Sequence, residues 1–235
     1  MNNKRNIQTI APFLADGFID LEKPIFDTDE YSTFLNKNAD RLGLFKKYLI
    51  CKLHDSWVID TNVSDNLFSI TLNDFSTHVF ADAIIERKNL SIDHDKLVFP
   101  IQIDFKTNNK VTFNEVDDNG NLTEIEPIEL DEYLYEQVVS IDNDKTELAF
   151  TFWKTFQDDK QGQTFVLLLT ATNIIISERQ DIAWQQVFGS EFDNYYQYFK
   201  QHFDSDRYVS DHNECEKLVD EYEQTQVTND KKPNR

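Results

Sequence analysis

Two hydrophobic periods alternate along the chain. Over residues 28–50, apolar side chains recur every three or four positions, which predicts a helix with one buried stripe. Over residues 57–73 the period is two, on both sides of a Ser64-Asp65-Asn66 turn. This pattern predicts a β-hairpin with one buried face. Its apolar positions are Trp57, Ile59, Phe68, Ile70 and Leu72, with Thr61 in the same phase as the first two.

More strands are predicted in the middle of the chain. Residues 97–105 contain Pro100, which has no amide hydrogen and therefore favours an edge strand. Two alternating runs flank residues 117–121, where Asn119-Gly120 is a strong hairpin signal because both residues tolerate positive φ. The remaining predicted strands cover residues 133–141, 148–156 and 164–176.

Helical spacing returns in two places. A short helix is expected up to Lys88, capped by Ser76 or Thr77, and further helices are expected from Ile182 to Tyr222. The order of helix, strands, short helix, strands and helices predicts an α+β fold. We expect a largely antiparallel sheet with an N-terminal helix and C-terminal helices.

A faint internal similarity suggests two related β-modules. Placing Leu53 on Leu134 also places Asn62 on Asn143 and Phe75 on Phe156. Two such modules would pack side by side, either as two domains or as one. The expected division is 1–128 (N-terminal helix and first β-module), 129–227 (second β-module and C-terminal helices) and a frayed tail, 228–235.

Composition excludes several functional classes. The formal net charge is −20 and the pI is about 4.5, which argues against direct binding to nucleic acid or to an anionic membrane. The five glycines form no phosphate-binding loop and no nucleophile elbow. Two isolated cysteines, Cys51 and Cys215, and a polar N-terminus without an apolar signal segment predict a cytoplasmic protein.

The negative charge is concentrated in one segment. Half of the net charge lies in residues 101–150, and no lysine or arginine occurs between Lys110 and Lys145. Such a segment can steer a basic partner protein, although it can also serve solubility alone. The partner-binding residues that we expect are Glu124, Glu126, Glu129, Asp131 and Glu132.

Aromatic residues near the end of the chain form a second candidate surface. They exceed what one helix face can bury, and exposed aromatics are enriched at binding hot spots. The alternative is that they pack onto the sheet. These residues are Trp184, Phe188, Phe192, Tyr195, Tyr196, Tyr198 and Phe199.

The histidines allow a different hypothesis, a metal-dependent hydrolase. Its ligands would be His54, Asp55 and His78, with His94 as a further candidate. A metal site needs three or four converging ligands, which spacing alone does not reveal. Our principal expectation is therefore that there is no catalytic residue, no metal and no cofactor.

The first predicted hairpin resembles a known type of domain. Leu53-His54-Asp55-Ser56, the turn and the following strand resemble the opening hairpin of small bacterial domains. Those domains occur in uncharacterised proteins and in immunity-protein-like families of contact-dependent or polymorphic toxin systems. The resemblance covers Lys52 to Phe75, and the second copy departs from it with Tyr135 and Glu136 in place of the His-Asp pair.

What the resemblance implies is a cytoplasmic acidic binder of a toxin or of another partner. Our leading hypothesis is accordingly a non-enzymatic inhibitor of the immunity or antitoxin type that covers a basic site on a protein, with a central aromatic patch to hold the complex. The alternatives are the metal-dependent hydrolase and a DNA mimic whose carboxylates are spaced like phosphates. The sequence predicts neither the identity of the partner nor the oligomeric state.

Overall fold

A computed structural model describes residues 5–15, 28–50, 52–156, 159–204 and 211–230. The chain forms two compact units that are interleaved in sequence. The first unit comprises Met1–Leu72 and Gln102–Ser177, and the second comprises Asn73–Ile101 and Glu178–Arg235.

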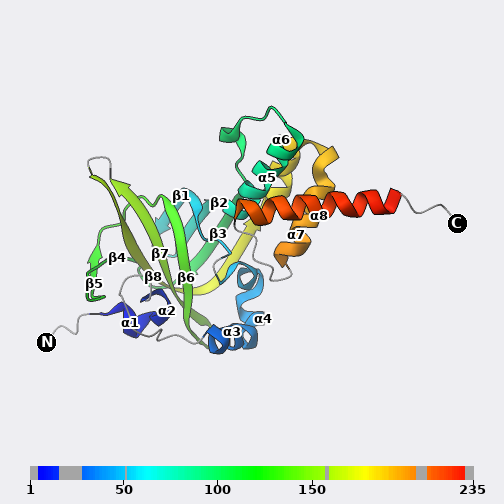
Figure 1. The fold of residues 1–235 in the computed structure, drawn as a ribbon. Helices are drawn as coiled ribbons and strands as arrows, with labels where there is room; N and C mark the ends of the chain where they lie inside the picture. The colour runs from blue at the N-terminus through cyan, green and yellow to red at the C-terminus, as the bar shows by residue number, and fades with distance from the viewer. Residues whose placement is uncertain (1–4, 16–27, 51, 157–158, 205–210, 231–235) are drawn as a thin grey trace. The chain divides into compact units, whose positions relative to one another are not determined.

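The first unit is built on an eight-stranded sheet with the order β3-β2-β1-β6-β7-β8-β4-β5 (Figure 1). The pairings of β1 with β6, β6 with β7, β7 with β8, and β4 with both β5 and β8 are antiparallel, so the α+β prediction is confirmed. The strands are β1 (Ser56–Ser64), β2 (Leu67–Asn73), β3 (Pro100–Thr107), β4 (Thr112–Val116), β5 (Leu122–Ile125), β6 (Glu132–Asp142), β7 (Lys145–Phe156) and β8 (Asp159–Glu178).

Two sequence expectations about strands are corrected. β3 is not an edge strand, because it pairs with β8 as well as with β2. Pro100 is tolerated there because it is the first residue of the strand. The boundary expected after residue 128 falls inside the first unit, since β1 and β6, from the two expected modules, belong to one sheet. Within that sheet Asn62 lies in β1 whereas Asn143 lies in a turn, so the proposed repeat does not align the two hairpins.

Short helices complete the first unit. The predicted helix over residues 28–50 is broken, because Asn38 separates two helices and Gly43 has a φ of +55°. The N-terminal helices bury Ile7, Ala11 and Leu14 in a cluster with sheet residues such as Ala149 and Val166. The helices are α1 (Ile7–Ile10), α2 (Pro12–Ala15), α3 (Thr28–Lys37), α4 (Ala39–Leu42) and the 3-10 helix η1 (Gly43–Tyr48).

The predicted Asn-Gly hairpin is confirmed between β4 and β5. Gly120 has a φ of +76°, and one carboxylate oxygen of Asp117 accepts the backbone N–H groups of Asn119 at 2.9 Å and Asn121 at 2.8 Å. Asp117 is thus used in holding the turn, as the turn chemistry of aspartate predicts.

The second unit is helical and its core is aromatic. Trp184 is fully buried, and its ring lies 4.4 Å from that of Phe188, 5.1 Å from Tyr196 and 5.9 Å from Phe80. Four of the seven C-terminal aromatics, Trp184, Phe188, Tyr196 and Phe199, are buried, whereas Phe192, Tyr195 and Tyr198 are partly buried. They pack against one another within the helical unit, and not onto the sheet as the alternative expected. The helices are α5 (Phe75–Lys88), η2 (His94–Lys96), α6 (Gln180–Phe188), η3 (Ser190–Phe192), α7 (Asp193–Asp204) and α8 (His212–Asp230).

Helix α8 extends beyond the helix expected to end near Tyr222 and includes the first residues of the expected frayed tail. The rest of that tail, residues 231–235, lies outside the described residues. Among the helices that are described, none is both long enough and apolar enough to cross a membrane.

Candidate functional site

The junction of β1 with β6 sorts its side chains onto two faces of the sheet. Ser56 lies opposite Tyr133 and Trp57 lies opposite Glu132, while Tyr133 and Glu132 lie opposite Phe152 and Trp153 of β7. Directly paired residues project from the same face, and successive residues from opposite faces. The row Ser56–Tyr133–Phe152 is buried, so the row Trp57–Glu132–Trp153 belongs to the outer face.

The outer face of β1 carries an exposed apolar stripe. Trp57, Ile59 and Val63 are 44%, 48% and 40% exposed. The sequence predicted a buried apolar face on both strands of this hairpin, and β2 does bury Phe68 and Ile70. On β1 the prediction is wrong, because Ser56 and not Trp57 points into the core. Exposed side chains of this size on one strand are typical of an interaction surface.

The pairing that defines this junction is short. The Cα register between β1 and β6 covers Ser56 and Trp57, and the N–H of Val58 donates to the carbonyl oxygen of Asp131 at 2.8 Å. The rest of β1, as far as Ser64, extends beyond this register. The stripe therefore continues past the start of β6, and the acidic residues at the start of β6 adjoin it.

Glu132 stands in an unusual electrostatic setting. Burial, together with a hydrogen bond and the negative charge of Asp55, raises the pKa of Glu132. Asp55 is held in the left-handed region at a φ of +63°, and its carboxylate oxygen lies 2.6 Å from Nδ1 of His54. The ring of His54 packs 4.5 Å from that of Tyr135. Glu132 thus lies between Trp57 and Trp153 and is hydrogen-bonded to Asp55, and a nearby cation would stabilise these two carboxyl groups.

The carboxylates of Asp131 and Glu129 differ in how closely they pair with Lys154. Asp131 accepts Nζ of Lys154 at 2.8 Å and the N–H of Thr155 at 2.8 Å. Burial acts to raise the pKa of Asp131, but these hydrogen bonds outweigh it and the pKa is lowered. Glu129 is 96% exposed and only reaches Lys154 at 4.0 Å. Glu129 is therefore the more available of the two charges.

The other two expected binding residues lie elsewhere. Glu124 is on β5, which is separated from β6 in the sheet order by β7, β8 and β4. It forms an ion pair with Lys110 at 2.7 Å, which lowers the pKa of Glu124. Glu126 follows the end of β5 and so lies outside the strand that carries Glu124. The five acids hence do not form one continuous edge.

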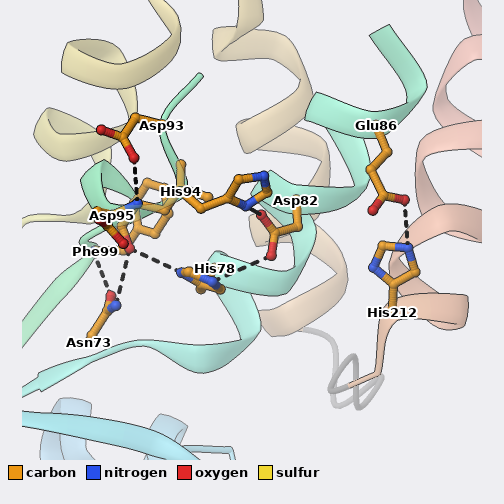
Figure 2. A network of polar contacts seen from close by, with 10 residues as sticks. Asn73, His78, Asp82, Glu86, Asp93, His94, Asp95, Phe99 and His212 are labelled. Carbon is orange, nitrogen blue, oxygen red and sulfur yellow. Dashed lines mark hydrogen bonds and ion pairs between the residues drawn. The ribbon is translucent and has the colours of Figure 1, made fainter. Parts of the chain in front are cut away.

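The second unit contains a network of histidines and carboxylates along α5 (Figure 2). Asp82 lies between two imidazoles, with Nδ1 of His94 at 2.8 Å and Nε2 of His78 at 3.4 Å. Nδ1 of His78 lies 3.0 Å from the carbonyl oxygen of Leu97, which can only accept a hydrogen bond. The Nδ1 nitrogen therefore carries the proton, and this contact fixes the ring so that Nε2 faces Asp82.

A neighbouring asparagine holds the same loop. The side-chain amide of Asn73 donates to the carbonyl oxygen of Leu97 at 3.1 Å, and its oxygen accepts the N–H of Phe99 at 2.7 Å. Asn73, His78 and His94 thus attach the segment around η2 to the start of α5 (Figure 2). The simplest role of His78 and His94 is structural.

One further group of possible metal ligands lies one helical turn along. Glu86 of α5 faces His212 and Glu216 of α8, and one ligand atom from each lies within 4.8 Å of the others. The spacing of His212 and Glu216 is a visible helical signal in the sequence, but the distant Glu86 could not have been assigned to it. Of the ligands in the hydrolase hypothesis, His54 and Asp55 belong to the first unit. His78 belongs to the second unit, where it lies beside Asp82, which also contacts His94.

A nucleophilic cysteine finds no support at the described thiol. Cys215 is fully buried, and burial raises the pKa of its thiol to about 12. A thiol in this state is unreactive, because the thiolate is the nucleophile. Cys51 lies outside the described residues.

Comparison with protein-family models, with curated proteins and with solved structures finds no match for the chain.

Proposed function

We propose that the protein is a non-enzymatic, cytoplasmic binding protein that holds a basic partner on the outer face of the first unit, as an immunity- or antitoxin-like inhibitor would. The observation that carries this proposal is the row Trp57–Glu132–Trp153, continued by Ile59 and Val63 along β1. We call these five residues the outer row.

The outer row fits a lysine or arginine side chain of the partner. Cations are attracted to the faces of tryptophan rings, and a carboxylate between two such rings adds a direct charge partner. Removing water strengthens these interactions, because the effective dielectric constant falls. The apolar positions Ile59 and Val63 would then supply the buried area that an isolated ion pair lacks.

The surrounding acidic residues affect the association rate of the partner more than its dissociation rate. Glu129 is almost fully exposed, and the whole chain carries a charge of −20. Long-range attraction of this kind raises association rates and falls with ionic strength. Glu124 and Asp131 contribute less, since Lys110 and Lys154 already pair with them.

The proposal is tested by capturing the partner from extracts of the native cell and then purifying it. Its affinity is measured by calorimetry for the wild type, for Trp57→Ala and for the control Ile182→Ala, which changes an exposed apolar residue of the second unit. We expect a loss of affinity of tenfold or more with Trp57→Ala alone, which corresponds to about 1.4 kcal/mol or more. Equal affinity of all three proteins would reject the proposal.

Duplex DNA added as a competitor separates this proposal from the DNA-mimic alternative. A DNA mimic would lose its partner to DNA and depend little on Trp57. The inhibitor proposed here requires Trp57 whether or not the partner also binds DNA.

A further inference from the structure

The contact between α5 and α8 contains a regular series of opposite charges. Arg87 lies 2.7 Å from Asp220, and Lys88 forms a close ion pair with Glu223. The pair with Glu223 raises the pKa of Lys88. Such ion pairs place opposite charges next to one another where the two helices meet.

The series is interrupted at Glu86. Here α5 presents a carboxylate where α8 also presents one, Glu216, and only the imidazole of His212 stands between them. Nε2 of His212 is 3.2 Å from Glu86 and 3.8 Å from Glu216 (Figure 2 shows the Glu86 contact). Like charges this close repel one another, so a cation at this position would stabilise the helix contact.

The separations of the donor atoms are compatible with one metal ion. Ligands held about 2.1 Å from a tetrahedral zinc ion lie about 3.4 Å from one another. Nε2 of His212 lies 3.2 Å from Glu86 and 3.8 Å from Glu216, on either side of this value, and all three donor atoms lie within 4.8 Å of one another. His212 and Glu216 are four residues apart on one helix, so they share a face, and Glu86 closes the site from the other helix.

We propose that Glu86, His212 and Glu216 bind one divalent transition-metal ion of the zinc class, which joins α8 to α5. The imidazole nitrogen favours zinc and its neighbours in the first transition series over calcium and magnesium, which prefer oxygen ligands alone. With three protein ligands, a water molecule completes the tetrahedron. All three side chains are exposed, so the ion enters without unfolding the unit.

The test is a calorimetric titration of the full chain with zinc chloride after treatment with a chelator, together with thermal unfolding. We expect one zinc ion per wild-type chain and a rise in melting temperature of about 5–10 °C at a zinc concentration a hundred times the dissociation constant. The variants His212→Ala and Glu216→Gln lose both effects. Magnesium chloride at the same concentration leaves the melting temperature unchanged.

The matched control is His94→Ala, which removes an exposed histidine from the neighbouring network around Asp82. It binds zinc as the wild type does. The proposal is overturned if the wild type binds no zinc, if His212→Ala binds it equally well, or if His94→Ala loses it. Loss of zinc binding in His94→Ala would move the metal to Asp82. Circular dichroism checks that each variant is folded. Zinc binding is measured on this chain alone, so the test does not require the partner protein.

Discussion

Trp57 in the first unit and Trp184 in the second differ in burial and in their surroundings. Trp184 on α6 is surrounded by rings, from Phe80 of α5 to Tyr196 of α7, and its indole N–H donates to the carbonyl of Phe192 at 3.2 Å. Trp57 follows Ser56, which is buried on the opposite face of β1, and 44% of the surface of Trp57 remains exposed. Trp184 is therefore part of the aromatic core, whereas Trp57 is a surface residue of the outer row that we propose binds the partner.

The largest expected effect is a difference in the free energy of unfolding between alanine variants of the two tryptophans. Trp184→Ala should lower the free energy of unfolding by about 3–5 kcal/mol, because it leaves a cavity among buried rings. Trp57→Ala should change it by less than about 1 kcal/mol, as expected for a surface position. Denaturant unfolding followed by circular dichroism measures both. Equal destabilisation would show that Trp57 is a core residue.

The next effect concerns the third tryptophan, Trp153, which covers Gly162 of the neighbouring strand. A Cβ atom at residue 162 would lie 2.0 Å from the Trp153 ring, so Gly162→Ala must displace the ring. We expect a destabilisation of about 1–3 kcal/mol, typical of overpacking. The double variant with Trp153→Ala should cancel part of this loss. Additive losses in the two changes would contradict the contact.

A smaller effect follows from the buried carboxyl group of the second unit. Burial raises the pKa of Asp74 despite hydrogen bonds from Thr77 and Gln180. A raised pKa in the folded state means that the stabilising contribution of this group is complete below the ordinary value of 3.8 and is lost as the pH rises through the raised pKa. Asp74→Asn should therefore gain stability relative to the wild type across this interval. A pH-independent difference between the two proteins would show that the carboxyl is not titrating there.

The smallest expected effect is the pH dependence of partner affinity that arises from Glu132 in the outer row. Because its pKa is raised, Glu132 loses its negative charge at a higher pH than an ordinary glutamate does. Affinity for a basic partner should accordingly fall in mildly acidic solution, and Glu132→Gln should remove this dependence while weakening binding a few-fold at neutral pH. Glu191→Gln, an exposed acid of the second unit, is the control and should retain the dependence.

Local signals in the sequence predicted the elements well. The Asn119-Gly120 turn and the long apolar strand β8 both follow from residue types within a few positions. The break in the helix at Gly43 and the capping of α5 depend on backbone geometry, which hydrophobic periodicity does not predict. A helix period continues in the sequence even where the chain turns.

Contacts between distant segments could not be predicted. Periodicity identified the alternation around Trp57 but not which face would be covered, because that depends on the strand paired with it, residues 132–142. In the same way the sequence grouped His78 with His54, whereas in the structure His78 contacts Asp82, which also contacts His94. The acidic segment was correctly located as a stretch of charge, but the lysines that neutralise Glu124 and Asp131 lie outside it or at its border.

The central claim is that the outer row, and not the net charge, holds the partner. The most direct measurement is the dissociation rate constant of the purified partner from the double variant Trp57→Ala/Glu132→Gln, beside the matched double variant Ile182→Ala/Glu191→Gln. We expect the partner to dissociate at least ten times faster from the first variant than from the wild type, and at the wild-type rate from the second. Equal dissociation rates for both variants would contradict it.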